Sequence, residues 1–501
     1  MKKGYNSTRS KDITVSASEG ILGGLAPDGG LFVPNFIHNN QLDKTKLIGK
    51  NYGELAQVIF SEFLTDFSEK QIKDAIQSAY YSGKFEFQEP VLLKKVKNRY
   101  FLELFHGPTC AFKDMALTIL PYFMVESIKN VSSHNKILIL TATSGDTGKA
   151  ALEGFADVDD ISIIVFYPKD GVSTIQEKQM LTQSGHNTCV VGISGNFDDT
   201  QNGVKEILCD TLLARELAKS NVVFSSANSI NIGRLIPQIV YYFYSYYELL
   251  KQGEIGADEK INFVVPTGNF GNILAGYYAK QLGLPINRLI CASNANKVLT
   301  DFFETGTYNR NRDFYKTSSP SMDILISSNL ERLLYDLSNE DSDAIEDLMK
   351  QLKTSGSYQA PKTLMEKTGL FYAGFADENQ TAQSIKAVFD ETHYLMDPHT
   401  AVANKVYDDY LHDTGDTTKT VIVSTASPYK FGRSVYESIF GASSLDDYAL
   451  LDLLAQKTNT QIPLPLKDLD KKENCHDIQC PKTKMPQAVL DFLKKQGENH
   501  A

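Results

Sequence analysis

From about residue 100 the chain alternates short, almost wholly apolar segments with amphipathic ones, and this alternation constrains the fold more than any other feature. We predict strands at 136–143, 161–168, 187–194, 261–267, 287–293 and 419–427. We predict helices at 146–156, 173–183, about 198–218 and 272–282. Continuously apolar strands are typical of a parallel sheet that helices cover on both faces. The pattern therefore predicts an α/β fold whose ligands bind beyond the carboxyl ends of the strands.

The segments on either side of this alternating region differ from it. Residues 52–64 and 70–81 have helical periodicity, and residues 26–34 indicate a turn followed by a short strand. A polar and helical stretch at about 297–385 interrupts the alternation. With 501 residues the chain has room for two or three domains. The predicted domains are an N-terminal domain at 1–95, a catalytic α/β region of two subdomains at 96–440, and a C-terminal helical tail at 441–501.

Composition excludes several classes of protein. The formal net charge of −11 disfavours a nucleic-acid-binding surface, which requires a basic face. The longest apolar stretch, 239–250, is too short to cross a bilayer, and no apolar run follows the N-terminal lysines as in a signal peptide. Cys475 and Cys480 flank His476, but a second pair of zinc ligands is missing. We expect a cytoplasmic protein with reduced thiols, no metal, and no nucleic-acid or membrane partner.

The stretch "HGPTCAFKD" (106–114) places Lys113 beside apolar residues. An amine in a crowded apolar site loses its proton more easily and becomes a nucleophile. The alternative is a surface lysine in an ordinary turn, and this stretch alone leaves both interpretations open.

The turn "PTGNFGN" (266–272) follows an apolar strand and opens a helix. Gly268 and Gly271 let the backbone approach a ligand, and the helix start presents N–H groups that favour an anion. Asn269 and Asn272 add donors. The turn is a candidate phosphate cradle, and the alternative is a tight turn with a glycine cap.

Two further turns offer anion sites. "TSGDTGK" (143–149) imitates a P-loop, but alanines replace its first glycine and its Ser/Thr, which rejects a P-loop NTPase. Its candidates for holding a carboxylate are Thr143, Ser144 and Thr147. In "SSANSINIGRLIPQ" (225–238) the candidates for a second anion are Asn228, Ser229 and Arg234. The alternatives are a capped helix start with Asp146 against the dipole, and a polar turn with a solvated arginine.

The last predicted strand ends in "STASPYKF" (424–431), which would place the Thr425 hydroxyl at the site. In "DPHTAVA" (397–403) we expect His399 to be a packed or capping residue rather than a catalytic base. The Tyr-rich stretch at 241–247 predicts a core helix whose hydroxyls reach a polar edge.

A lysine in an apolar turn, a phosphate cradle and a hydroxyl at the end of a late strand are what pyridoxal phosphate requires. The motifs also resemble those of the threonine synthase family in its longer form, which occurs in fungi and many bacteria. In chain order they are "GLAPDGGLFVP" (24–34), "HGPTCAFKD" (106–114), "SGDTG" (144–148), "SANSINIGR" (226–234), "PTGNFGN" (266–272), "SPSMDILISSNLERLLY" (319–335) and "DPHTA" (397–401). The resemblance implies fold type II of the pyridoxal phosphate enzymes with an extra N-terminal domain. It also implies a lyase that converts O-phospho-L-homoserine and water into L-threonine and phosphate, the last step of threonine biosynthesis.

The resemblance further implies roles for individual residues. Lys113 would be the Schiff-base lysine and Thr425 would face the pyridine nitrogen. The cofactor phosphate would be bound by Gly268, Asn269, Phe270, Gly271 and Asn272. The substrate phosphate would be held by Asn228, Ser229 and Arg234, and the substrate carboxylate by Thr143, Ser144 and Thr147. Asp146 stands where many fold type II enzymes have an asparagine, so it is a site residue whose role stays open, as does that of His106.

Two other functions remain open from the sequence. One is a pyridoxal-phosphate-dependent serine/threonine dehydratase-type β-eliminase, against which the Asn228–Arg234 set counts because its substrates carry no phosphate. The other is a non-catalytic homologue that binds phosphorylated metabolites, against which the intact Lys113 counts. The sequence does not decide between a monomer and a homodimer.

Overall fold

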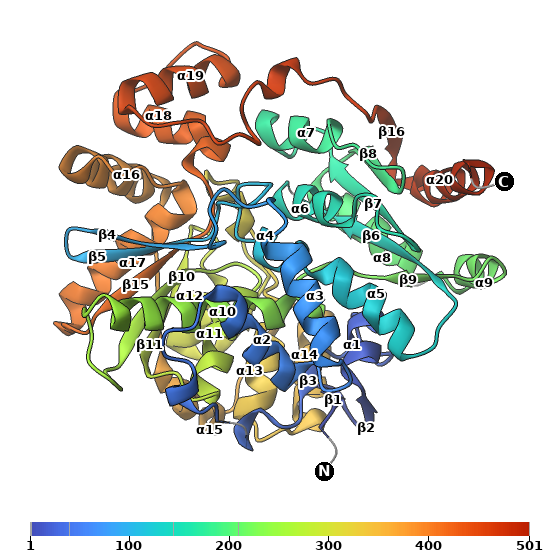
Figure 1. Cartoon of the computed structure of the whole chain (residues 1–501), viewed down its shortest axis with the longest axis horizontal. Helices are drawn as coiled ribbons and strands as arrows, with labels where there is room; N and C mark the ends of the chain where they lie inside the picture. Colours follow the sequence, from blue (N-terminus) through green and yellow to red (C-terminus); the bar gives the residue numbers. More distant parts are fainter. Residues whose placement is uncertain (1–2, 40, 144, 209, 500–501) are drawn as a thin grey trace.

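The computed structural model describes residues 3–39, 41–143, 145–208 and 210–499. Two β-sheets, each packed against helices, form its centre (Figure 1). The larger sheet has the strand order β14-β11-β10-β15-β5-β4, and β4 is its antiparallel edge. Its strands are β4 (Leu92–Val96), β5 (Arg99–Glu103), β10 (Ile261–Pro266), β11 (Ile286–Ser293), β14 (Phe371–Phe375) and β15 (Thr420–Ser424).

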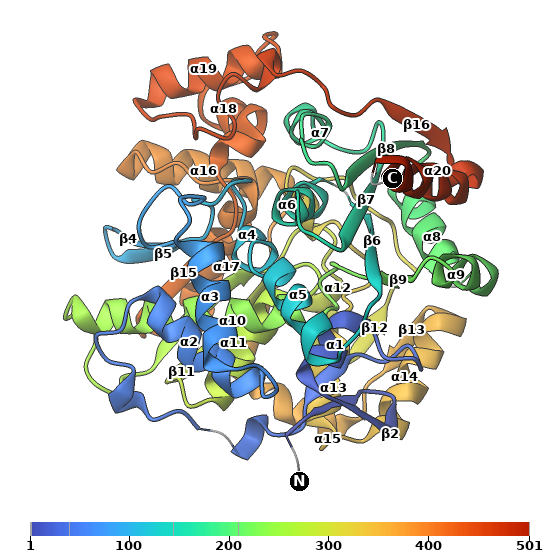
Figure 2. The same cartoon turned by 45° about the vertical axis from the view of Figure 1, so that its right-hand side comes forward.

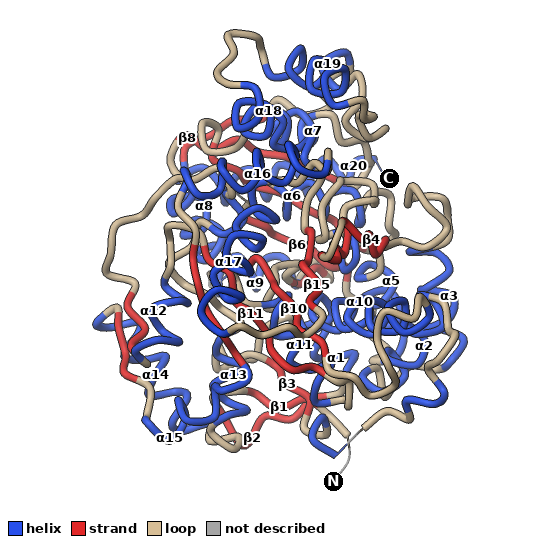
Figure 3. Tube along the Cα trace, turned by 90° about the vertical axis from the view of Figure 1, so that its left-hand side faces the viewer, coloured by secondary structure: helices blue, strands red, loops and turns tan. Residues whose placement is uncertain are grey.

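Helices cover both faces of the larger sheet because its strands are apolar on both sides. Phe263 and Val265 of β10 join a core with α10 (Ile232–Lys251) and α11 (Gly271–Gln281). Val264, which points to the other face, joins a second core with α17 (Pro398–Thr414) and α18 (Gly432–Phe440). Figure 3 shows α17 and α10 on opposite sides of β10 and β15. The predicted α/β fold, with helices on both faces, is confirmed.

The smaller sheet is wholly parallel and has the order β16-β8-β7-β6-β9. Its strands are β6 (Lys136–Ala142), β7 (Ile161–Pro168), β8 (Thr188–Ser194), β9 (Val222–Ser225) and β16 (Ile478–Pro481). The helices around it are α5 (Leu120–Asn130), α6 (Asp146–Phe155), α7 (Thr174–Leu181), α8 (Phe197–Leu208), α9 (Thr211–Ala218) and α20 (Met485–Asn499). Figure 2 shows the C-terminal segment reaching this sheet, where β16 lies beside β8.

The smaller sheet differs from the sequence expectations in two places. The single helix predicted at about 198–218 is two helices, because Asp210 caps a new start by accepting bonds from the amides of Leu212 and Leu213. The segment 441–501 contains the strand β16 in addition to its helices, because Ile478 and the following residues pair with β8.

The N-terminal residues build a small antiparallel sheet and three helices, and the Asn51–Glu54 and Ser68–Gln71 capping boxes start α2 and α3. These elements are β1 (Tyr5–Ser7), β2 (Ser10–Val15), α1 (Ala17–Gly23), β3 (Phe32–Pro34), α2 (Tyr52–Phe63) and α3 (Glu69–Tyr80). Phe60 of α2 packs edge-on against Phe123 of α5, with ring centroids 5.3 Å apart. Edge-to-face aromatic pairs of this kind help to hold the N-terminal helices against the rest of the chain.

The other elements lie mainly in the interrupting stretch and around the site. They are α4 (Asp114–Leu117), α12 (Val298–Thr305), β12 (Thr307–Asn309), α13 (Leu330–Leu337), α14 (Ser342–Ser355), β13 (Ser357–Gln359), α15 (Lys362–Met365), α16 (Glu378–Thr392) and α19 (Asp447–Thr458). Two short 3-10 turns, Pro320–Met322 and Pro428–Phe431, carry Ser321 and Lys430. None of the helices in the described ranges combines the length and apolarity needed to cross a bilayer.

Candidate active site

The loop that carries Lys113 lies at the carboxyl end of β5 and is bonded to the loop that follows the neighbouring strand β15. The Phe112 amide donates to the Thr425 carbonyl (2.8 Å), and the Ser427 amide donates to the Cys110 carbonyl (3.0 Å). Thr425 itself is buried. Because β5 and β15 are adjacent parallel strands, their ends converge, and this places Lys113 beside the segment 425–430.

Lys113 is buried in a site that contains both apolar and charged neighbours. Its Nζ lies 4.8 Å from the centroid of the Phe112 ring, 3.2 Å from Ser321 Oγ and 3.5 Å from Asp146 Oδ2. Burial lowers the pKa of Lys113, the Asp146 carboxylate acts in the opposite direction, and the charges of Lys430 and Arg234 add to the lowering. The interpretation of Lys113 as a solvated surface lysine is therefore wrong.

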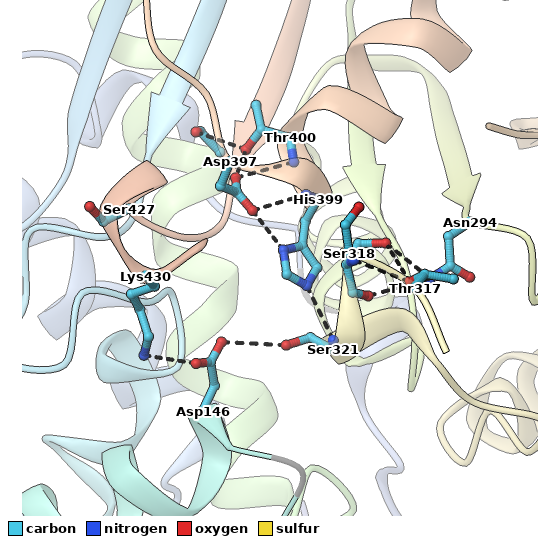
Figure 4. A network of polar contacts seen from close by, with 12 residues as sticks. Asp146, Asn294, Thr317, Ser318, Ser321, Asp397, His399, Thr400, Ser427 and Lys430 are labelled. Atoms are coloured by element: carbon cyan, nitrogen blue, oxygen red, sulfur yellow. Dashed lines mark hydrogen bonds and ion pairs between the residues drawn. The ribbon is translucent and has the colours of Figure 1, made fainter. Parts of the chain in front are cut away.

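Asp146, at the start of α6, is paired with a second buried lysine. Lys430 Nζ lies 2.7 Å from Asp146 Oδ1 (Figure 4). It also donates to the Thr109 carbonyl at 2.8 Å. Gln176 Nε2 also donates to Asp146 Oδ1, at 2.9 Å. Burial alone would raise the pKa of Asp146, but the Lys430 and Lys113 charges outweigh it and hold that pKa well below its usual range. Asp146 is therefore an anion at neutral pH.

Lys430 was not singled out from the sequence, although it stands in the quoted segment 424–431. Its neighbours along the chain include Tyr429 and Phe431, and a lysine among apolar residues was the same signal that drew attention to Lys113. The two lysines approach one carboxylate from different loops, and only the pairing of β5 with β15 reveals it.

The turn from β10 to α11 has the features of a phosphate cradle. A Cβ atom on Gly268 would lie 2.6 Å from the Ser321 carbonyl oxygen, so only glycine fits there. Phe270 adopts a left-handed conformation (φ 62°), and no side chain of the described residues caps the first amides of α11. Buried Asn272 Nδ2 has no partner among the described residues. Unpaired donors at a helix N-terminus are suited to an anion.

The core helix α10 orients this cradle. The hydroxyls of Tyr241 and Tyr242 lie 2.7 and 2.8 Å from Asn272 Oδ1. With its oxygen held from behind, the Asn272 amide nitrogen is left to face the turn. The predicted core helix whose tyrosine hydroxyls reach a polar edge is confirmed.

Arg234 lies in the first turn of α10 and is buried. Its Nη1 donates to the Ala227 carbonyl at 2.9 Å, whereas its Nε has no partner in the part of the chain that the structure describes. Burial lowers the pKa of Arg234 to about 10, so the guanidinium remains a cation at neutral pH. Asn228 and Ser229 lie half-buried in the preceding turn. A buried cation with an unused N–H is suited to a second anion.

Buried Arg332 connects the two candidate anion-binding turns. Its Nη2 donates to the Ile230 carbonyl at 2.6 Å, and its Nη1 bonds to the Asn329 side chain, whose own Nδ2 donates to the Asn269 carbonyl at 2.9 Å. Its Nε donates to the Phe32 carbonyl of the N-terminal sheet at 2.9 Å. The sequence motif 319–335 contained Arg332 without indicating this function.

The turn at 143–149 serves partly to start α6. Thr143 Oγ1 accepts bonds from the amides of Gly145 (3.0 Å) and Gly148 (2.9 Å), so it caps the helix, which was the alternative interpretation of this turn. Thr147 is half-buried in the first turn of α6. Ser144 lies outside the described residues.

His106, whose role the sequence left open, and His399, which we expected to be a packed or capping residue, have different surroundings. His106 lies between Glu86 and Glu103, whose carboxylates are 2.8 and 2.9 Å from its ring nitrogens. Burial acts to lower the pKa of His106, but these hydrogen bonds outweigh it and raise the pKa. With both nitrogens engaged, His106 stabilises its loop. His399, in the first turn of α17, bonds both to Asp397 and to the Ser321 amide.

The described cysteines, Cys110, Cys189, Cys291, Cys475 and Cys480, are free thiols. Across the described ranges, no cluster of three or more His, Cys, Asp or Glu side chains is arranged to hold a metal ion.

Comparison with known families covers most of the chain. Residues 4–80 match the family "Threonine synthase N terminus", and residues 90–426 match the family "Pyridoxal-phosphate dependent enzyme". The chain is 36% identical over 472 residues to threonine synthase of Saccharomyces cerevisiae, which covers 88% of this chain and 90% of that protein. It is 39% identical over 436 residues to threonine synthase-like 1 of Macaca fascicularis, which covers 84% of this chain. It spans only 58% of the length of that relative.

A solved structure shows the same architecture. The structure of pyridoxal-phosphate-bound threonine synthase from Brucella melitensis superimposes with a TM-score of 0.86 at 34% sequence identity and covers 99% of both chains. The expected fold type II with an added N-terminal domain is therefore confirmed. The chain belongs to the threonine synthase family of pyridoxal-phosphate-dependent enzymes.

Proposed function

We propose that this protein converts O-phospho-L-homoserine and water into L-threonine and phosphate with pyridoxal 5′-phosphate as cofactor. The observation that supports this reaction is the presence of two separate anion-binding turns beside one buried lysine. The cofactor needs one phosphate site, and a phosphorylated substrate needs the other. A dehydratase acting on serine or threonine would leave the buried Arg234 guanidinium without an anion, which is costly.

The residues at the first turn fit the cofactor. Its phosphate would be held by the glycine-rich turn and the free amides of α11, through Gly268, Asn269, Phe270, Gly271 and Asn272. Thr425 would face the ring nitrogen, and Lys113 would carry the covalent link. Bound there, the cofactor supplies an electron sink for the charge that forms when a proton leaves the substrate.

Lys113 would act as the base, because burial lowers its pKa and favours the neutral amine. Lys430 neutralises the negative charge of Asp146. A second positive charge on Lys113 is therefore not needed to balance that carboxylate. This arrangement gives Asp146 a role that the sequence left open. Phe112 and the neighbouring buried residues exclude water from the amine.

The substrate would be held at both ends. Arg234, with Asn228 and Ser229, would bind its phosphate and retain it after release. Thr143, Thr147 and Ser144 would bind its carboxylate. Thr143 Oγ1 accepts two amide bonds, and its own hydroxyl hydrogen remains available to donate to a carboxylate oxygen.

We also propose the domain division at 1–95, 96–440 and 441–501, a cytoplasmic location, and a monomer or homodimer. The free thiols support the location, because disulfides are rare in the cytoplasm. The contacts of α2 with α10 support an N-terminal unit that packs on the catalytic region.

The test is to load the purified protein with pyridoxal phosphate, add O-phospho-L-homoserine, and measure phosphate and threonine in the same sample. We expect equal amounts of both from the wild type and neither from Lys113→Ala. Keto-acid release from threonine at a comparable rate, without phosphate release from phosphohomoserine, would identify a dehydratase instead.

A further inference from the structure

Ser321 touches the Lys113 amine although the known motifs give it no role. It lies in the 3-10 turn Pro320–Met322, whose carbonyl side packs against Gly268 of the phosphate cradle. Lys113 Nζ donates to Ser321 Oγ at 3.2 Å, and Ser321 Oγ donates to Asp146 Oδ2 at 3.4 Å. Lys113 Nζ also donates to Asp146 Oδ2 directly, at 3.5 Å. The three groups form a closed triangle of hydrogen bonds.

The number of N–H bonds on the amine determines where its lone pair points in this triangle. A neutral primary amine has two N–H bonds and one lone pair. Ser321 and Asp146 accept from both N–H bonds, so the lone pair is directed away from these two oxygens. A lone pair that no neighbour occupies is free to attack a carbonyl carbon or to accept a proton.

A second chain of contacts holds Ser321 in place (Figure 4). The Ser321 amide donates to His399 Nε2 at 3.2 Å. Because a backbone N–H can only donate, Nε2 must be unprotonated and the ring proton must lie on Nδ1. His399 Nδ1 is 2.6 Å from Asp397 Oδ2, which accepts that proton's hydrogen bond. Asp397 in turn accepts the amides of His399 and Thr400, so its orientation is fixed by the first turn of α17.

The loop itself is shaped by another set of bonds, which leaves Ser321 at its tip. The Thr317 amide donates to Asp323 Oδ2 at 2.9 Å, and Asn294 Nδ2 donates to Asp323 Oδ1 at 2.8 Å. These bonds close the loop on either side of the 3-10 turn. His399 is then the contact that fixes the Ser321 backbone from the side of α17.

We propose that Ser321 is a catalytic residue that, together with Asp146, engages both N–H bonds of the neutral Lys113 amine and aims its lone pair, and that His399 and Asp397 are positioning residues for Ser321. This inference rests on the proposed function of Lys113 as the cofactor-bearing amine. It adds a positioning role to the packed or capping role that we expected for His399.

The test measures the rate at which pyridoxal phosphate attaches to cofactor-free protein, followed by absorbance, with borohydride reduction and mass spectrometry to confirm attachment at Lys113. Ser321→Ala should slow attachment about tenfold, the loss expected for one hydrogen bond to a reactive group. Ser318→Ala is the matched control, because its hydroxyl is in the same loop and contacts Glu378 instead; it should attach at the wild-type rate.

A pair of His399 variants separates positioning from a merely structural role. In His399→Gln the amide oxygen can occupy the place of Nε2 and accept from the Ser321 amide, so it should attach at close to the wild-type rate. In His399→Asn the shorter amide reaches only the place of Nδ1, so attachment should slow several-fold. This pair also answers the question if Ser321→Ala does not fold.

Wild-type attachment rates in both Ser321→Ala and His399→Asn would overturn the inference, as would equal slowing by His399→Asn and His399→Gln. Attachment needs no substrate, so the result is independent of the proposed reaction. Absence of phosphate release from phosphohomoserine, with the Ser321 dependence intact, would overturn the proposed reaction and leave this inference standing.

Discussion

Replacing Lys430 by methionine removes one cation from the buried Lys430–Asp146–Lys113 cluster while keeping much of the side-chain volume. The Lys430 Nζ to Asp146 Oδ1 distance is 2.7 Å, and both side chains are almost completely buried. At an effective dielectric constant of about 20, that distance corresponds to a direct attraction of about 6 kcal/mol. Lys113 remains as a weaker partner at 3.5 Å. We therefore expect Lys430→Met to lower the free energy of unfolding by about 3–5 kcal/mol. This is the usual cost of removing one partner of a buried ion pair, because the other charge stays buried without compensation.

The pH dependence of stability in the acid range, here called the acid limb, gives an independent readout of this ion pair. The folded-state pKa of Asp146 lies below its unfolded value, so its contribution is fully present above about pH 4 and is lost as the pH falls further. In Lys430→Met the folded-state pKa rises, because the nearest cation is gone. A loss of about 3 kcal/mol in the stabilisation of the Asp146 carboxylate corresponds to a rise of about two units in its pKa. Acid unfolding should therefore begin at a higher pH in this variant.

The assay is urea unfolding of the cofactor-free protein for Lys430→Met, Asp146→Asn and the double variant, at pH 7 and across the acid range. The double variant leaves neither charge buried without its partner, so it should be more stable than the sum of the two single changes predicts, by about 2 kcal/mol. Additive losses, or an unchanged acid limb in Lys430→Met, would refute the reasoning that Lys430 neutralises Asp146.

Four further predictions follow from the site. Arg332→Met should weaken binding of both the cofactor and the phosphorylated substrate about tenfold each, because one guanidinium supports both turns; titration of each ligand checks this, and an effect on only one would contradict it. Arg234→Ala should raise KM for O-phospho-L-homoserine by more than tenfold with little change in cofactor affinity; reduced cofactor affinity with an unchanged KM would mean that the two anion sites were interchanged. Gly268→Ala should reduce cofactor affinity more than tenfold, since its Cβ would approach the Ser321 carbonyl to 2.6 Å, and binding titration tests it. The rate of cofactor attachment should rise with pH around a midpoint below the ordinary lysine value of about 10.4, because burial lowers the pKa of Lys113; a midpoint at or above that value would show that the amine is not desolvated.

Local pattern was sufficient for many of the strands and helices of the two central sheets. The predicted strand at 136–143 is β6 (Lys136–Ala142), and the predicted helix at 272–282 is α11 (Gly271–Gln281). Strand period, glycine turns and apolar runs are properties of neighbours along the chain, so they can be recognised without the fold. The break at Asp210 was missed because a polar cap inside a helical pattern resembles an ordinary surface residue.

Only part of the candidate site could be predicted from local sequence patterns. Gly268 and Asn272 stand within one turn, and a glycine-rich turn before a helix predicts an anion cradle by itself. Ser321, His399 and Arg332 carry no such signal. Each is an ordinary residue of a loop or helix until a distant segment is placed against it, as the bonds from Ser321 to His399 and from Arg332 to Ile230 demonstrate.

The sequence by itself predicted an α/β chain with a candidate reactive lysine and candidate anion-binding turns, because these depend on residue type and local spacing. Only the tertiary structure decided the electrostatics around that lysine. Lys430 and Thr109, which are in contact, are 321 positions apart. They meet because β15 lies beside β5 in the sheet order, and no local propensity encodes that neighbourhood. The low pKa of Asp146 and the lowered pKa of Lys113 depend on this pairing of strands and on the burial around it, because it brings Lys430 to both side chains.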